Sequence, residues 1–203
     1  MNKEQLIVLL KREGFEEKIV RAFEKVHRED FVQENMKKLA YENIALPITE
    51  SETISQPSTI ALALSMLKLK ENQKVLEIGS GCGYVLALIA EIVGQNGRVL
   101  GIEIVKELAE KSKKLLKNHK NIEIFNKNGN KGFPEEAPFD RIVISAALEK
   151  VPREILEQLK EKGILVAPIG PGFMQTLTSI KRAKDEFIIT KEIPGFIFVH
   201  FVE

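Results

Sequence analysis

Residues 75–84 read Val75-Leu76-Glu77-Ile78-Gly79-Ser80-Gly81-Cys82-Gly83-Tyr84, and this stretch decides the fold. A short apolar strand runs into three alternating glycines, and a helical pattern follows over residues 84–93. Glycine has no Cβ atom, so the backbone can turn with positive φ and a ligand can approach its N–H groups closely. The following helix points its positive end at the turn. The pattern predicts a nucleotide-type cofactor site at Gly79, Ser80, Gly81 and Gly83.

Strand and helix patterns alternate on both sides of this turn. Five strands are predicted, over residues 74–78, 98–103, 122–126, 141–145 and 164–169. Three helices are predicted between them, over residues 84–93, 105–116 and 152–159. The strands around Val75, Val99 and Ile142 are continuous apolar runs, as expected when helices cover both faces of a parallel sheet. The fold class is therefore α/β, a doubly wound and mostly parallel sheet.

The two ends of the chain add smaller parts to this sheet. Residues up to Val26 have a helical pattern, and residues 31–57 form a long connection without an obvious element. A helix is expected from Pro57 to residue 69, with Ser55 or Gln56 near its N-cap. Residues 177–181 and 187–201 predict an antiparallel hairpin at one sheet edge. We expect one domain over 1–203, with a helical and loop extension (1–56) and a cofactor-binding core (57–203).

Composition excludes several classes of function. The chain has 203 residues and a formal net charge of +1, which gives no general attraction to nucleic acid or membranes. Its start lacks a signal-peptide pattern and it has no apolar run of about 18 residues, so we expect a cytoplasmic protein, taken as a monomer. Cys82 is the one cysteine, and the three histidines lie far apart. No metal site is predicted.

The spacing of the turn narrows the choice of cofactor. A dinucleotide fingerprint needs a further glycine where Tyr84 stands, so NAD is disfavoured. Glu77 near the end of its strand suits a ligand with an ammonium group. Glu103 ends the next strand, where a carboxylate can accept both hydroxyls of a ribose, although it could be an ordinary exposed glutamate. Asn128-Gly129 either meets an adenine edge or forms a plain turn. S-adenosylmethionine fits these features.

The chain resembles the protein-L-isoaspartate O-methyltransferases, a family of Rossmann-like S-adenosylmethionine-dependent enzymes. The resemblance covers residues 26–202. It rests on the glycine turn and on Leu39-Ala40-Tyr41-Glu42, Thr53-Ile54-Ser55-Gln56-Pro57, residues 129–133, Ala137-Pro138-Phe139-Asp140, Val151-Pro152 and Ala167-Pro168-Ile169-Gly170. It implies cofactor binding by Thr53, Ile54, Glu77, Gly79, Ser80, Gly81, Gly83, Glu103, Ile104, Asn128 and Gly129.

The resemblance also implies the reaction, which is methyl transfer to the α-carboxylate of L-isoaspartyl residues in damaged proteins. A carboxyl group titrates near pH 3–4, so the acceptor is already ionised and no general base is needed. The rate enhancement then comes from proximity and orientation. The family's active-site serine corresponds to Ser55, whose hydroxyl can donate to the acceptor carboxylate. The alternative is that Ser55 only caps the helix that begins at Pro57.

Several residues depart from the family pattern. Ser58 replaces a histidine, Asn128 an aspartate and His200 a proline, and family members usually continue beyond Glu203. The shorter tail is expected to leave the cofactor more open, with His200 an exposed edge residue. Two alternatives stay open: a methyltransferase with another acceptor, such as tRNA or a small molecule, and a non-catalytic cofactor-binding module. Against base methylation, Ser145-Ala146-Ala147-Leu148 offers no proline-aromatic stretch to stack a base.

Overall fold

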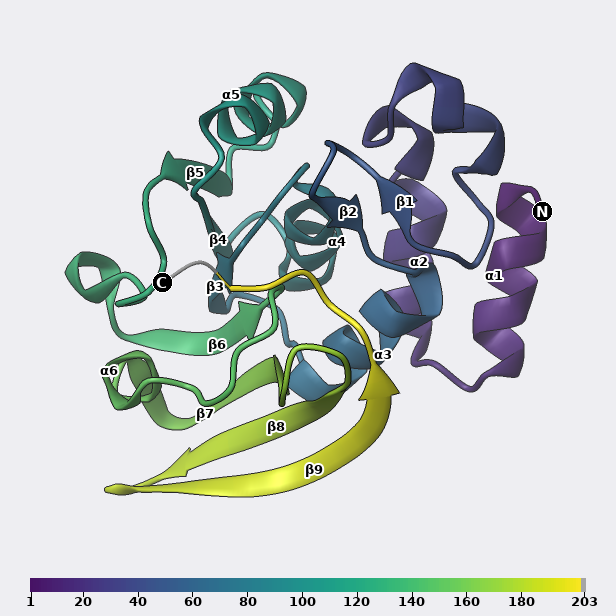
Figure 1. Cartoon of the computed structure of the whole chain (residues 1–203). Coiled ribbons are helices and arrows are strands. Elements are labelled where there is room, and N and C mark those ends of the chain that lie inside the picture. Colours follow the sequence, from purple (N-terminus) through teal and green to yellow (C-terminus); the bar gives the residue numbers. More distant parts are fainter. Residues whose placement is uncertain (202–203) are drawn as a thin grey trace.

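The computed structural model describes residues 1–201 and is built around one seven-stranded sheet. The strand order is β5-β4-β3-β6-β7-β8-β9, with parallel pairing from β5 to β7 and antiparallel pairing from β7 to β9. The strands are β3 (Lys74–Ile78), β4 (Arg98–Glu103), β5 (Ile122–Asn126), β6 (Phe139–Ile144), β7 (Leu159–Ile169), β8 (Gln175–Ala183) and β9 (Glu186–Phe196). The doubly wound, mostly parallel fold with an antiparallel edge is confirmed (Figure 1).

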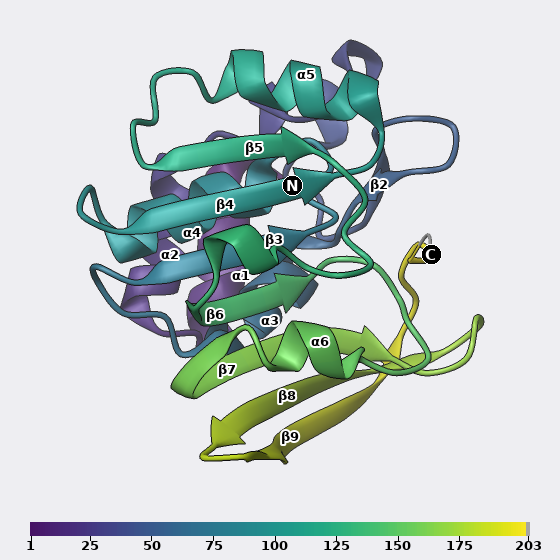
Figure 2. The same ribbon diagram turned by 90° about the vertical axis from the view of Figure 1, so that its left-hand side faces the viewer.

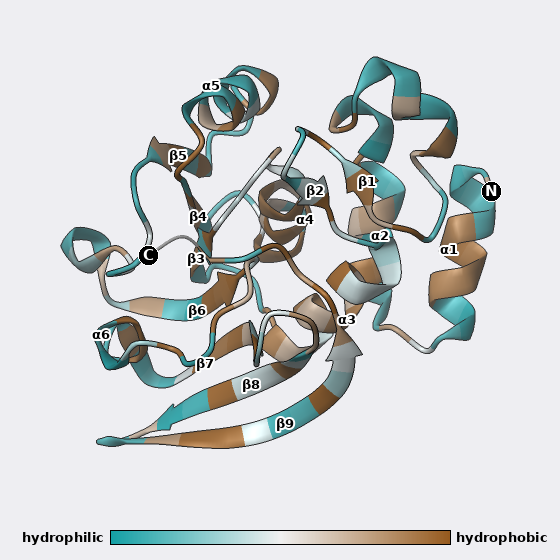
Figure 3. Ribbon diagram, viewed as in Figure 1, coloured by the Kyte–Doolittle hydropathy of each residue, from teal (hydrophilic) through white to brown (hydrophobic). Residues whose placement is uncertain are grey.

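Helices cover both faces of the sheet, and the sheet separates two cores. The α-helices are α1 (Lys3–Arg12), α2 (Glu17–Lys25), α3 (Pro57–Leu67), α4 (Tyr84–Val93), α5 (Lys106–Leu115) and α6 (Arg153–Leu156). Val75 and Val99 pack into the core under α1 to α5, whereas Leu76 and Leu100 face the core that contains Ile155 of α6. Alternate strand residues thus bury opposite faces, which explains the continuous apolar runs. Helix α4 is apolar along most of its length (Figure 3).

The carboxyl ends of the parallel strands all point to one edge of the sheet (Figure 2). Chain order runs outward from β3 to β5 and then restarts at β6 on the other side of β3. In open α/β sheets, ligands bind at such a topological switch point. Residues 197–201, which follow β9, return to this same edge. In the part of the chain that the structure describes, no helix is long and apolar enough to cross a membrane.

The connection over residues 31–57 holds more structure than its sequence predicts. It contains the two short strands β1 (Leu46–Pro47) and β2 (Thr53–Ile54), which pair in antiparallel register. Two 3-10 helices, Arg28–Asp30 and Glu34–Leu39, precede them, and a third is Pro134–Glu136. Strands of two residues are too short to show a period, so the expectation of no element was wrong for this segment.

Strand β7 and helix α6 also differ from expectation. The strand begins at Leu159 rather than at 164, and the helix expected over 152–159 is limited to α6. The early part of β7 is a charged run, in which Lys160 Nζ bonds Asp140 Oδ2 at 2.8 Å, so it lacks the apolar pattern of a buried strand. Leu159 nevertheless pairs with Phe139 of β6. The last residue of the predicted helix, Leu159, therefore belongs to the start of β7, which is held by its contacts with β6.

Other boundaries agree more closely. The predicted bounds of β3, β4, β5 and α4 match the structure residue by residue, and those of α3, α5 and β6 differ by one or two residues at an end. The C-terminal hairpin turns at Lys184-Asp185, as expected, but its strands begin earlier and β9 ends at Phe196. Residues 197–201 leave the sheet edge. Phe201 N donates to Ala147 O at 2.8 Å, so the tail crosses back toward β6.

Candidate functional site

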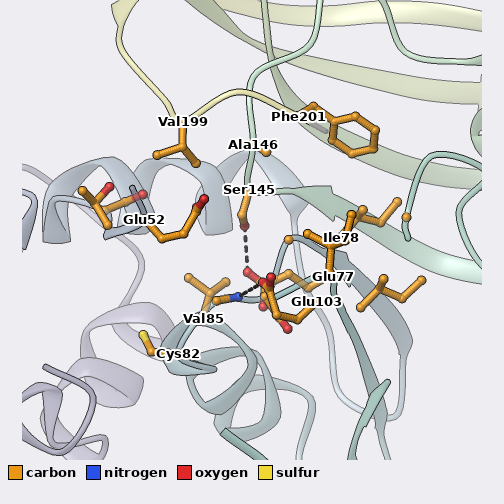
Figure 4. A pocket seen from close by; sticks show the side chains of 18 of the residues that line it. Glu52, Glu77, Ile78, Cys82, Val85, Glu103, Ser145, Ala146, Val199 and Phe201 are labelled. Carbon is orange, nitrogen blue, oxygen red and sulfur yellow. Dashed lines mark hydrogen bonds between the residues drawn. The ribbon is translucent and has the colours of Figure 1, made fainter. Parts of the chain in front are cut away.

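The candidate site is a pocket at the carboxyl edge of β3, β4 and β6, enclosing about 830 Å³ including its open mouth. It is lined by eleven of the twelve predicted site residues: Thr53, Ile54, Ser55, Glu77, Gly79, Ser80, Gly81, Glu103, Ile104, Asn128 and Gly129. Gly83 is the exception, because it lies behind the turn as the N-cap of α4. Segments far apart in the sequence thus meet around one cavity (Figure 4).

The glycine turn is shaped by positive φ angles. Gly79, Gly81 and Gly83 have φ of 80°, 52° and 85°, a region that residues with a Cβ atom rarely adopt. A Cβ atom at Gly83 would lie 2.8 Å from Leu116 Cδ1. This glycine therefore allows close packing of α4 against the end of α5, and it contacts no ligand space.

The N–H groups of the turn are used inside the protein. Gly79 and Ser80 both donate to Ile102 O, at 2.9 and 3.0 Å, and Gly83 donates to Ser80 O at 2.8 Å. Gly81 donates to Glu103 Oε2 at 2.7 Å. These four N–H groups are therefore not free to bind a ligand, and close approach of a ligand to the turn stays a prediction. A phosphate would find no free donor at these four residues.

Glu77 is buried at the junction of β3 and β6. Its side chain is 1% exposed, and Ser145 Oγ donates to Glu77 Oε1 at 2.7 Å. The second carboxylate oxygen, Oε2, has no partner among the described residues. Burial raises the pKa of Glu77 to about 8, against the lowering effect of the Ser145 hydrogen bond. An unpartnered carboxylate oxygen inside a pocket suits a cationic group, such as the ammonium of S-adenosylmethionine.

Glu103 is held rigidly at the end of β4. Its two oxygens accept from the backbone N–H groups of Gly81 at 2.7 Å and Val105 at 2.8 Å. The residue is 5% exposed, so the alternative of an ordinary exposed glutamate was wrong. Each carboxylate oxygen has a second lone pair, which can accept from a ribose hydroxyl.

The residues expected near adenine have local roles as well. Asn128 Oδ1 accepts from Asn130 N at 2.9 Å and closes a turn, which leaves one lone pair of that oxygen for a ligand. A Cβ atom at Gly129 would lie 2.3 Å from Ile78 Cγ2, so the loop can pass over β3 only with glycine there. Asn128-Gly129 is thus both a turn and part of the pocket wall.

Ser55 lies between β2 and α3. The N-cap of α3 is Gln56, and no side chain makes a capping hydrogen bond there. Pairing of Leu46 with Ile54 fixes the strand that ends just before Ser55. The interpretation of Ser55 as only a helix cap was therefore wrong, and the side chain is left to line the pocket.

The chain's tail lies along the pocket. Val199 O accepts from Ala147 N at 2.7 Å, and Val199, His200 and Phe201 are lining residues. His200 is exposed and bridges to Ala147, as an edge residue would. The described part of the tail thus forms one wall of the pocket.

Ser145 and Glu52 are polar lining residues that the sequence did not predict. Ser145 directly follows β6, and the rule that ligands meet the carboxyl ends of strands could have identified it. Glu52 lies in the β1–β2 connection, where nothing in the sequence predicted a pocket wall. Cys82 also lines the pocket, and burial raises the pKa of its thiol to about 11, which agrees with its interpretation as a small packing residue.

A switch-point pocket at the end of β3, with acids on β3 and β4 and with the N–H groups of Gly79, Ser80, Gly81 and Gly83 already bonded, is typical of the S-adenosylmethionine-dependent methyltransferases. Two buried polar atoms without partners, Glu77 Oε2 and Ser80 Oγ, fit a polar ligand there. The chain belongs to the protein-L-isoaspartate(D-aspartate) O-methyltransferase family, whose sequence profile matches residues 1–203. The family expected from the sequence is confirmed.

Individual relatives agree with this assignment. The chain is 39% identical to protein-L-isoaspartate O-methyltransferase of Ignicoccus hospitalis, over 99% of this chain and 97% of the relative. It is 42% identical to protein-L-isoaspartate O-methyltransferase 2 of Archaeoglobus fulgidus, over 83% of this chain and 78% of the relative.

Solved structures of the same family have the same fold. One protein-L-isoaspartate O-methyltransferase structure matches 97% of this chain with a TM-score of 0.88 and 29% identity, and this chain spans 65% of its length. The Plasmodium falciparum protein, solved with S-adenosyl-L-homocysteine, matches 100% of this chain and 99% of its own, with a TM-score of 0.86 and 27% identity.

Proposed function

We propose that this pocket binds S-adenosylmethionine and that the chain transfers its methyl group to the α-carboxylate of L-isoaspartyl residues in damaged proteins. Family membership supports the reaction, and the complex of the Plasmodium falciparum neighbour with S-adenosyl-L-homocysteine supports the cofactor. Glu77 would hold the ammonium group, Glu103 the ribose hydroxyls, and Asn128 with Gly129 the adenine edge. Thr53, Ile54 and Ile104 would complete the walls.

The observation that carries the proposal is the place of Ser55 between two cavities. It lines the cofactor pocket and also a neighbouring groove. The groove is lined further by Ala45, Gln56, Thr59 and residues 195–199 of the tail. An isoaspartyl segment in this groove would meet the pocket at Ser55. The bound cofactor supplies an electrophilic methyl group on its sulfonium. Ser55 would donate a hydrogen bond to the carboxylate and fix its line of approach.

The test uses two peptides that are identical except for Asp or L-isoAsp at one position. The chain should methylate only the L-isoAsp peptide. Ser55→Ala should lower kcat/KM about 10- to 100-fold, the range for losing a hydrogen bond to a charged group. The affinity for S-adenosylmethionine should stay within about twofold. Ser65→Ala, on α3 and outside both cavities, is the matched control and should keep full activity.

Methylation of neither peptide by a chain that binds the cofactor would overturn the proposed acceptor. The formal net charge of +1 gives no support for tRNA as the alternative acceptor. Failure to bind S-adenosylmethionine in calorimetry would overturn the cofactor as well.

A further inference from the structure

The lining of the cofactor pocket is rich in acidic residues. Among its described lining residues are three glutamates, Glu52, Glu77 and Glu103, and neither lysine nor arginine. Burial is the main cause of the raised pKa of Glu52 and of Glu77, and the charge of Glu103 adds to both shifts, so the three acids lie within electrostatic range of each other. Figure 4 shows all three on the walls of the same cavity. Such a pocket favours a ligand that carries a positive charge in addition to one ammonium group.

Glu77 and Glu103 have assigned partners in the proposed function, but Glu52 has none. Its backbone is fixed at the tip of the β1–β2 hairpin: its N–H donates to Thr49 Oγ1 at 2.9 Å, and its carbonyl accepts from Ile48 N at 2.8 Å. Its carboxylate has only a long contact of 3.5 Å from Ser51 Oγ. The hairpin thus holds a carboxylate against the pocket without pairing it to any described cation.

We propose that Glu52 makes the pocket prefer the positively charged S-adenosylmethionine over the neutral thioether product. This inference rests on the proposed function. Methyl transfer moves the methyl group from sulfur to the acceptor oxygen, and the C–S bonding pair stays on sulfur, which loses its positive charge. The acceptor carboxylate becomes a neutral ester. Glu52 would therefore stabilise the substrate form of the cofactor and favour release of the product form.

The orphaned Glu77 Oε2 supports a cationic ligand in this cavity, because it is a buried carboxyl oxygen without a partner among the described residues. Glu52 is partly exposed, so solvent screens its charge and its effect should be moderate. Its charge should also repel the acceptor carboxylate, since Ser55 lies three residues further along the same wall. Removing the charge of Glu52 should therefore weaken the pocket's preference for S-adenosylmethionine over the product. The same change should improve binding of the acceptor, so the two effects have opposite signs.

The experiment measures the Kd of S-adenosylmethionine and of S-adenosyl-L-homocysteine by calorimetry, for the full chain, Glu52→Gln and Glu50→Gln. Glu50 is exposed on the same hairpin tip and does not line the pocket, so it is the matched control. Glu52→Gln should reduce the preference for S-adenosylmethionine over product about tenfold, mainly through weaker cofactor binding. The KM for an L-isoAsp peptide should fall severalfold. Glu50→Gln should change neither quantity.

Raising the salt concentration tests the same inference by screening the charge of Glu52. It should narrow the preference for S-adenosylmethionine over S-adenosyl-L-homocysteine in the full chain and in Glu50→Gln, and much less in Glu52→Gln. The inference would be overturned if both ligands bind the full chain and neither Glu52→Gln nor salt changes the preference for S-adenosylmethionine. That result would leave the proposed function intact. Binding of neither ligand would overturn the proposed function itself.

Discussion

Glu77→Gln is the most informative single change at the proposed cofactor site. Burial raises the pKa of Glu77 to about 8, so the carboxyl is mostly protonated at neutral pH when the pocket holds no cofactor. An ammonium group placed against it would need the carboxylate form. Cofactor binding below pH 8 must therefore release a proton, and the affinity should rise about tenfold per pH unit between about pH 6 and 7.

The loss of affinity in the variant can be estimated from the same values. Removing one partner of a buried ion pair costs about 3–5 kcal/mol. At pH 7, ionising the carboxyl already costs about 1.4 kcal/mol, since its pKa lies about one unit higher. The difference of about 2–4 kcal/mol predicts affinity about 30- to 1,000-fold weaker. Glutamine can still accept from Ser145, so the variant should fold.

Calorimetry in buffers with different ionisation enthalpies measures both effects. The full chain should release close to one proton per cofactor at pH 6 to 7, and Glu77→Gln should release none. Without cofactor, the folded-state pKa exceeds the ordinary value of 4.5. The contribution of Glu77 to the free energy of unfolding is thus complete below pH 4.5 and is lost as the pH rises through about 8. An affinity independent of pH, or equal binding by the variant, would refute this reasoning.

Three further changes test other parts of the site and its support. Ser145→Ala removes a hydrogen bond that lowers the pKa of Glu77, so the pH dependence of cofactor binding should move to higher pH, with about 10-fold weaker binding at pH 7 in calorimetry. Gly83→Ala places a Cβ atom 2.8 Å from Leu116 at positive φ and should cost about 1–3 kcal/mol in urea unfolding. Arg28 is a buried cation, and two of its donors, Nε and Nη1, have no partner among the described residues. Arg28→Met should therefore leave the free energy of unfolding equal or raise it by up to about 4 kcal/mol. A clear decrease in the free energy of unfolding would contradict this expectation.

The central fold could be predicted because its signals are local. The strand before the glycine turn is an apolar run, and the three glycines mark the turn without reference to distant residues. The same holds for Glu103, whose place at the end of β4 follows from the bounds of the strand. The position of these acids at one sheet edge then follows from parallel topology.

The remaining features depend on contacts between distant segments. Glu52 reaches the pocket only because two-residue strands pair, Leu46 with Ile54 and Pro47 with Thr53. The raised pKa of Glu77 depends on complete burial between β3 and β6, which no local pattern reports. The early start of β7 depends on the pairing of Leu159 with Phe139 of β6.

The internal bonding of the glycine turn has a consequence for the environment of a living cell. Phosphorylated nucleotides are abundant there, and P-loop and dinucleotide-binding folds hold their phosphates through free N–H groups of glycine-rich turns. Here Ile102 O, Ser80 O and Glu103 occupy the N–H groups of Gly79, Ser80, Gly81 and Gly83 before any ligand arrives. ATP or NAD would share an adenosine with the cofactor but would gain no phosphate contact from these four N–H groups. The pocket can thus resist competition from the nucleotide pool without a side chain that blocks entry.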